Sequence, residues 1–431
     1  MKRKITEKLV KWKEKTNNRL PLLIYGARQV GKTYIIQEFG LAYYKNTVYV
    51  NFERMPIVSN FFDGDISPNR IIGLLESFFN EKIIPESTLI IFDEIQACER
   101  ALTSLKYFAE EAPEYHIIGA GSLLGVAINR GRFSFPVGKV EMITMYPLDF
   151  EEYLLATGGK YYVDEIRKHF NENMTMPEAM HNDLIENFKK YLVIGGMPAV
   201  INEYLNTKSL VSVAETQNYI LNSYIADMSK YADNNEMVKI KGTYDSIPTQ
   251  LYKENTKFQY KLIKKGASAN LFGASIDWLI QAGIVIKGQK VEQGNRPLVV
   301  FADLSAFKIY MSDVGLLTTK ANLGYKEILS YDIISTFKGG LIENYVAQTL
   351  MASNHNIYYW ESNSKAEVDF VIQTDEAIIP IEVKANTTNK SKSLDVFMER
   401  YKPDYAIRIS AKNFGYANKI KSVPLYATFC I

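Results

Sequence analysis

The residues best suited to chemistry are the eight from Gly26 to Thr33, which read GARQVGKT. In a GxxxxGK[ST] pattern the glycines let the main chain wrap around phosphate, so that successive N–H groups point at the anion. The lysine reaches the β- and γ-phosphates, and the hydroxyl after it ligates Mg²⁺. The apolar run Pro21–Tyr25 precedes the motif and a helical pattern follows it, which is the setting that the motif requires. We therefore predict ATP and Mg²⁺ as cofactors, with Lys32 also catalytic. The predicted contacts are Gly26, Ala27, Arg28, Gln29, Val30, Gly31, Lys32 and Thr33.

A second part of such a site lies at Leu89–Glu94, an apolar run that ends in two acids. Asp93 is predicted to bind Mg²⁺, directly or through water, and Glu94 to orient or deprotonate the attacking water. Two acids can also simply end a strand in solvent, but the upstream phosphate motif favours the catalytic interpretation. The next apolar run, His116–Gly119, leads to Ser122. Ser122 either contacts the γ-phosphate or the water, or belongs to a turn of small residues.

A separate set of charged residues lies near the end of the chain, in the strand-like stretches EVDFVI and IIPIEVKA. Residues two apart on a strand share a face, so Glu382 and Lys384 project together, and a hairpin would add Asp369. Glu343, on a predicted helix over 340–352, is a fourth candidate. Two carboxylates around one cation make a magnesium site, and a lysine beside it stabilises charge on a phosphate. We expect Asp369, Glu382 and Glu343 as metal ligands and Lys384 as a catalytic group, with activity left open.

Lysines outnumber acids by nine to three between residues 238 and 290. Ala269–Gly283 has apolar residues at helical spacing, and Ile284–Val291 with Leu298–Ala302 is predicted as a hairpin. Helices followed by a hairpin favour a winged helix that binds DNA. The alternatives are a solvated lysine-rich face or a hairpin that packs within the chain. The predicted phosphate contacts are Lys261, Lys264 and Lys265.

The elements that position these residues follow two patterns. In the first part of the chain short apolar runs alternate with helical stretches, which predicts a parallel sheet covered on both faces. Near Tyr146 the pattern becomes helical, and Gly and Pro clusters such as 195–198 interrupt it. A chain of 431 residues is too long for one core and predicts several domains.

Composition limits the classes of protein to consider. The net charge of +2 gives no indication of a nucleic-acid or membrane partner for the chain as a whole. Cys98 and Cys430 are the two cysteines, which excludes a disulfide framework and fits a reducing compartment. The basic N-terminus lacks the apolar core of a signal peptide, and no run of about 18 apolar residues occurs. We interpret the protein as cytoplasmic, with no membrane partner.

Several stretches resemble a family of prokaryotic AAA-like ATPases that carry a C-terminal domain of unknown function. They are GARQVGKT, LIIFDEIQ, the GSLLG turn, YPLDFEEYL, YLVIGGMPAVI, KIYMSDVGLL and IEVKA. The resemblance implies an α/β fold: a P-loop AAA-type parallel sheet with a helical lid, then a winged-helix domain and a restriction-endonuclease-like α/β domain. The order Glu, Asp, Glu-x-Lys looks like the PD-(D/E)xK nuclease pattern, although Val368 replaces the usual proline. The expected domains are 1–155 for the ATPase core, 156–235 for the lid, 236–328 for the winged helix and 329–431 for the nuclease-like part.

Two functions remain open from the sequence. The first is an ATP-hydrolysing AAA-type enzyme that acts on DNA, with an end domain that is a possible nuclease. The second is a slowly hydrolysing signalling switch whose end domain does not cut and binds a protein partner. An oligomer is possible in either case, and Arg130 or Arg132 is a candidate to reach a neighbouring subunit's nucleotide.

Overall fold

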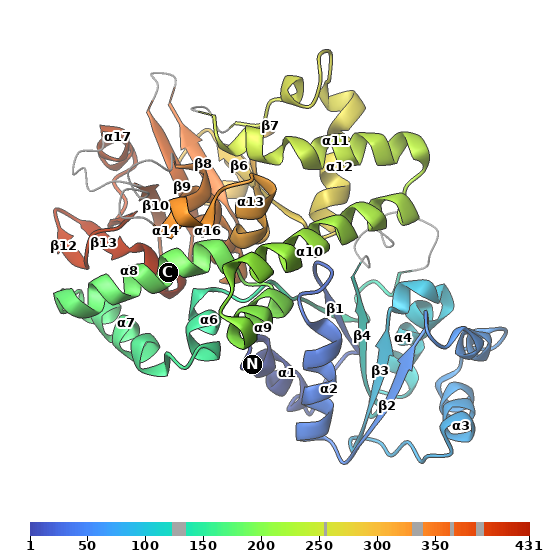
Figure 1. The fold of residues 1–431 in the computed structure, drawn as a ribbon. Helices are drawn as coiled ribbons and strands as arrows, with labels where there is room; N and C mark the ends of the chain where they lie inside the picture. Colours follow the sequence, from blue (N-terminus) through green and yellow to red (C-terminus); the bar gives the residue numbers. More distant parts are fainter. Residues whose placement is uncertain (123–134, 254–256, 330–338, 363–365, 385–391) are drawn as a thin grey trace. The chain divides into compact units, whose positions relative to one another are not determined.

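The computed structural model describes residues 1–122, 135–253, 257–329, 339–362, 366–384 and 392–431 (Figure 1). The chain divides into two compact units. One contains residues 2–146 with 281–283, and the other contains residue 1 with 147–280 and 284–431. The boundary after Tyr146 falls where the sequence pattern becomes helical. The finer division into four domains stays a prediction.

A five-stranded parallel sheet forms the centre of the N-terminal unit, in the order β2-β3-β4-β1-β5. Every residue of β3 and β4 is buried, which explains their unbroken apolar sequences. The prediction of a parallel sheet in this region is confirmed. The strands are β1 (Leu22–Tyr25), β2 (Asn46–Asn51), β3 (Thr88–Asp93), β4 (His116–Gly121) and β5 (Glu141–Thr144).

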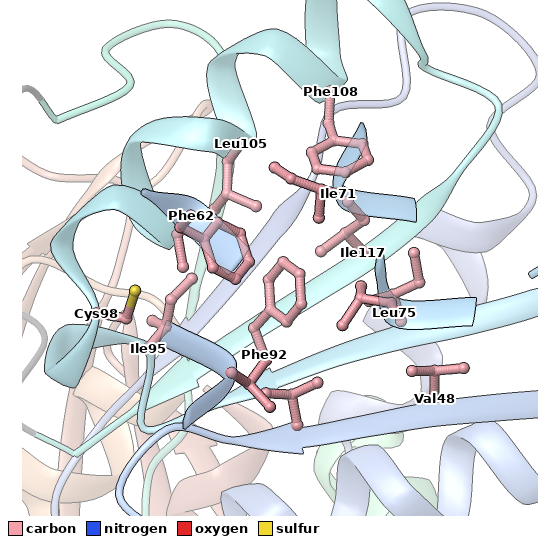
Figure 2. Close-up of a cluster of buried hydrophobic side chains, with 14 of the residues drawn as sticks. Val48, Phe62, Ile71, Leu75, Phe92, Ile95, Cys98, Leu105, Phe108 and Ile117 are labelled. Carbon is pink, nitrogen blue, oxygen red and sulfur yellow. The ribbon is translucent and has the colours of Figure 1, made fainter. Parts of the chain in front are cut away.

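Helices connect these strands and cover the sheet. Figure 2 shows the core that α3 and α4 make with β3, in which the rings of Phe62 and Phe92 meet edge to face at 5.7 Å. Leu75 and Leu105 are also buried there. This packing fixes β3, and with it the position of the acids that follow. The helical segments are α1 (Ile5–Lys13), α2 (Lys32–Tyr43), η1 (Pro56–Phe62), α3 (Pro68–Phe79), η2 (Ile95–Ala97) and α4 (Glu99–Glu111).

The C-terminal unit contains an eight-stranded mixed sheet, in the order β12-β13-β11-β10-β9-β8-β6-β7. The antiparallel hairpin β6–β7 is part of this sheet, because β6 pairs in parallel with β8. The strands β8, β9 and β10 form an antiparallel meander, and β11 runs parallel to β10. The strands are β6 (Val285–Val291), β7 (Ala302–Met311), β8 (Tyr358–Glu361), β9 (Glu367–Gln373), β10 (Ile378–Val383), β11 (Ala406–Ser410), β12 (Gly415–Ala417) and β13 (Ile420–Pro424).

One strand prediction in this region is wrong. Leu298–Ala302 is not the second strand of the hairpin, because Leu298–Phe301 forms the short 3-10 helix η4 and β7 begins at Ala302. The N–H of Val300 bonds to the carbonyl of Pro297 at 3.1 Å, which closes a tight turn directly after the proline. Leu298 is buried, whereas Val299 and Val300 are exposed. An apolar run alone did not distinguish this turn from a strand.

The second unit also contains helices, some of which pack against its sheet. Every residue of α16 (Gly340–Ala352) from Gly340 to Leu350 is buried, and α16 is followed by the meander, by α17 (Lys392–Tyr401) and by β11. No helix in the described ranges has both the length and the apolar character to cross a membrane. The other helices are α6 (Phe150–Ala156), α7 (Lys160–Glu172), α8 (Glu178–Ile194), α9 (Pro198–Thr207), α10 (Leu210–Tyr231), α11 (Asn234–Leu251), η3 (Tyr260–Leu262), α12 (Ala269–Gln281), α13 (Val314–Lys320), α14 (Tyr325–Leu329) and η5 (Leu425–Cys430).

Three motifs that are far apart in the sequence meet at one place in this unit, which we call the Asp313 junction (Asp313, Gly196 and Leu148). The Asp313 carboxylate accepts the N–H of Gly196 at 2.6 Å and that of Leu316 at 2.9 Å. The Gly196 carbonyl accepts the N–H of Leu148 at 2.8 Å, and the Tyr191 hydroxyl donates to the Leu148 carbonyl at 2.7 Å. The stretches YPLDF, GGMP and SDVGLL therefore form one hydrogen-bonded unit.

Candidate nucleotide-binding and hydrolysis site

The register of the parallel sheet brings the predicted site residues to one edge. Tyr25 pairs with Gly121, and Asp93 pairs with both Ala120 and Asn51. Parallel strands end at the same edge of their sheet, which is where ligands bind in open α/β sheets. The loop after β1, the acids after β3 and Ser122 after β4 therefore share this edge.

The loop between β1 and α2 adopts a main-chain path that depends on glycine. Gly26 has φ of +147° and Gly31 has φ of +94°. A Cβ at Gly26 would lie 2.1 Å from the carbonyl oxygen of Met145, so a larger residue does not fit there. Because α2 begins at Lys32, directly after this loop, the loop and the positive end of the helix dipole point to the same place.

Lys32 lies almost fully buried under this loop. Its ammonium donates to the carbonyl oxygens of Gly26 at 2.8 Å and Ala27 at 2.9 Å. The lysine thus holds the first turn of the loop closed and keeps a positive charge beside its N–H groups. In proteins with this motif the lysine reaches the β- and γ-phosphates of the bound nucleotide.

Asp93 is buried and lies at the centre of a hydrogen-bond network. Its Oδ2 atom accepts from the Thr33 hydroxyl at 3.0 Å, the Tyr49 hydroxyl at 2.7 Å and the Asn51 amide at 3.3 Å. Its Oδ1 atom accepts the N–H of Glu94 at 3.1 Å. The predicted metal ligands Thr33 and Asp93 are therefore adjacent, and both offer the hard oxygen atoms that Mg²⁺ prefers, so these residues fit a magnesium ion.

Glu94 is held in a defined position beside Asp93. Its backbone has φ of +49°, which is uncommon for a residue with a side chain. Its carboxylate accepts the Gln96 amide at 2.5 Å. Ser122, one residue beyond β4, is buried. Backbone conformations of this kind cost free energy, and in proteins they cluster at active sites and ligand-binding segments.

Tyr49 and Asn51 are site residues that sequence reasoning missed. They alternate with the buried Val48 and Val50 on β2, so both lie on one face of that strand. Burial raises the pKa of Tyr49 to about 12, and its hydrogen bond to Asp93 acts in the same direction. Tyr49 is therefore a hydroxyl donor at neutral pH. The one feature of the sequence that could have identified these two residues is that they are polar and lie at the end of an apolar strand.

The charged residues of the C-terminal unit are arranged differently from the predicted metal site. Lys384 pairs with Glu382 at 3.0 Å, and Arg408 approaches the same carboxylate at 3.6 Å. Asp369 accepts the N–H of Val383 at 2.7 Å. Glu343 instead contacts groups on β7, as described below. Within the described ranges, no group of three or more His, Cys, Asp or Glu side chains is placed to hold a metal ion.

The predicted DNA contacts Lys261, Lys264 and Lys265 are all exposed. Lys261 lies in the short 3-10 helix η3, and Lys264 and Lys265 lie between η3 and α12, so none of the three is on α12. Arg130 and Arg132, the candidates to reach a neighbouring subunit, lie outside the described residues.

The loop before Lys32 and the acids at this edge of the sheet have the arrangement of a P-loop nucleotide site. In agreement, a family model for an AAA domain matches residues 18–154. Two further models, both for domains of unknown function, match residues 185–327 (DUF8612) and 338–428 (DUF4143). The sequence matches no curated protein.

The chain is distantly similar to several solved structures. The Walker-type ATPase PABY2304 of Pyrococcus abyssi has 15% identity and a TM-score of 0.44, over 73% of this chain and 94% of that one. The ORC2 protein of Aeropyrum pernix, in ADPNP–ADP complexes, has 11% identity and a TM-score of 0.36, over 72% and 88%. AMPPCP-bound DnaA of Aquifex aeolicus has 13% identity and a TM-score of 0.29, over 64% and 87%. Likenesses at this level do not specify an activity or a partner.

Proposed function

We propose that this chain binds ATP with Mg²⁺, hydrolyses it, and couples hydrolysis to work on DNA. The observation that carries the first part is the convergence of Lys32, Thr33 and Asp93 at the carboxyl edge of the sheet, with a hydroxyl–carboxylate distance of 3.0 Å. A bound Mg²⁺ would supply charge neutralisation to the phosphates. The side chains around the metal site would supply the remaining chemistry.

Each residue has a distinct role in this proposal. Lys32 turns from the loop carbonyls to the β- and γ-phosphates, and the main-chain N–H groups of 26–31 bind the remaining oxygens. Thr33 and Asp93 hold the metal, while Tyr49 and Asn51 keep Asp93 in place. Glu94, oriented by Gln96, accepts the proton of the attacking water or aligns that water. Ser122 is placed at the same edge to contact the γ-phosphate or the water.

The finer domain assignments are also part of the proposal. Residues 156–235 would be a helical lid and 236–328 a winged helix that contacts DNA through its exposed lysines. The element order α16, β8, β9, β10, α17, β11 supports a nuclease-like fold for residues 329–431. In this scheme the ATP state changes the packing of core and lid and so controls access to DNA.

The Glu94→Gln variant tests the hydrolytic role. The amide is nearly isosteric with the carboxylate but is not a base, so we expect ATP binding to persist while turnover falls about 100-fold or more. Turnover should be measured with and without single-stranded, duplex and branched DNA. Wild-type turnover in the variant would remove Glu94 from the mechanism. Near-zero turnover of the wild type with all DNA forms, and tightly retained nucleotide, would instead support a slow signalling switch.

A further inference from the structure

A lysine of the β6–β7 hairpin is buried among the carboxylates of the end domain. The Lys308 side chain is 1% exposed, and its ammonium pairs with Glu343 at 2.9 Å and with Glu367 at 2.5 Å. The Tyr310 hydroxyl donates to the same Glu343 oxygen at 2.6 Å. Lys308 and Tyr310 come from β7, Glu343 from α16, and Glu367 with Asp369 from β9. We call Lys308, Tyr310, Glu343, Glu367 and Asp369 the Lys308 cluster.

The electrostatics of this cluster favour a charged lysine. Burial on its own would lower the pKa of Lys308, but the carboxylates of Glu343, Glu367 and Asp369 outweigh burial and raise it. Burial, and then the negative charge of Glu343, raises the pKa of Asp369. A buried ammonium persists only where several oxygen atoms replace its lost water, and the cluster supplies them.

A divalent cation does not fit this arrangement of donors. The Oε1 atom of Glu343 already accepts from both Lys308 and Tyr310. Asp369 accepts the N–H of Val383, and Glu382 on the neighbouring strand is paired with Lys384. In the part of the chain that the structure describes, these acids do not gather into a metal-binding group. Part of the negative charge of the cluster is balanced by Lys308, a cation that belongs to the chain itself.

We propose that the Lys308 ammonium is the resident cation of this cluster and excludes divalent metal ions from Glu343 and Asp369. The end domain then does not use these acids for metal-dependent cutting. The neutralising charge comes from β7, which precedes the nuclease-like segment in the sequence. The β6–β8 pairing, which joins the hairpin to the meander, is what brings Lys308 to the carboxylates. This proposal is independent of the ATPase site.

The test uses the full chain without nucleotide, in an Asp93→Asn background that removes the other predicted metal site. Thermal melting is measured with increasing Mn²⁺ for this parent and for added Lys308→Met or Lys160→Met. Because Lys308→Met leaves the carboxylates without their cation, we expect a lower Tm and a saturable rise in Tm with Mn²⁺. The parent and the Lys160→Met control, which loses an exposed lysine outside the cluster, should show no such rise. A Lys308→Met variant that gains nothing from Mn²⁺ would overturn the proposal.

A second measurement does not depend on folding of the Lys308 variant. Bound Mn²⁺ is counted by electron paramagnetic resonance for the parent and for the parent with Asp369→Asn. We expect equal numbers of bound ions. A parent that binds one more Mn²⁺ than the Asp369 variant would show a metal site at these acids and contradict the proposal.

Discussion

Asp313 shows how one buried carboxylate organises distant parts of the chain. It is fully buried, and burial raises its pKa to about 6 from 3.8, although the N–H groups of Gly196, Leu316 and Gly315 oppose the shift. An acid whose pKa is higher in the folded state binds more protons there than in the unfolded state. Its contribution to the free energy of unfolding therefore rises as the pH falls from about 6 to about 4.

The Asp313→Asn variant tests this sign. The wild type should gain stability relative to the variant as the pH falls through that range, by at most about 3 kcal/mol, because one pKa unit corresponds to about 1.4 kcal/mol. Urea unfolding from pH 7 to pH 4 measures the difference. Asn at the exposed Asp404 is the matched control and should show no comparable change. A wild type that loses stability relative to Asp313→Asn on acidification would refute the assignment.

At the scale of elements, the turn before α9 depends on the absence of a side chain at Gly196. A Cβ there would lie 1.9 Å from the carbonyl oxygen of Leu148, a backbone atom of the Asp313 junction. Gly196→Ala should therefore destabilise the chain by about 1–3 kcal/mol or more, measured by the urea midpoint. Gly273, within α12, has open space at the same atom, and its replacement by Ala should be neutral or stabilising. Equal effects of the two changes would show that the junction is not tightly packed.

The segment from η3 to α12 carries the proposed DNA contacts. If Lys261, Lys264 and Lys265 each neutralise one phosphate, their joint replacement by Ala should reduce the slope of log affinity against log salt by about 3. Fluorescence anisotropy with duplex DNA at several salt concentrations measures that slope. Replacement of the exposed Lys11, Lys106 and Lys160 is the control and should leave it unchanged. Binding that is insensitive to salt would exclude phosphate contact by this segment.

At the scale of the whole molecule, the features that the sequence predicted correctly are helices and strands that are set by a local pattern of residues. The strand–loop–helix around Lys32 and the strand that ends at Asp93 follow from apolar runs and glycine spacing, and the structure has both. The helix over 340–352 has the expected bounds, and strands lie in both predicted stretches, EVDFVI and IIPIEVKA. Such features are visible in sequence because each is set by neighbouring residues.

What the sequence did not predict depends on pairings between distant segments. Tyr49 and Asn51 belong to no motif, and they reach Asp93 because β2 lies beside β3. Lys308 reaches Glu343 because α16 packs against β7, which periodicity does not reveal. The turn at Leu298 was missed because the run LVVF has the composition of a strand. Long-range register, and not local propensity, decides these contacts.

The proposed function depends on nucleotide binding at Lys32, and calorimetric titration with Mg·ATP tests that binding most directly. The wild type should show one saturable site, and Lys32→Ala should weaken it by about 10- to 100-fold, the value of a charge-assisted hydrogen bond to phosphate. Circular dichroism of both proteins would confirm that the variant is folded. A wild type that shows no binding at saturating Mg·ATP, or a variant that binds equally well, would contradict the central claim.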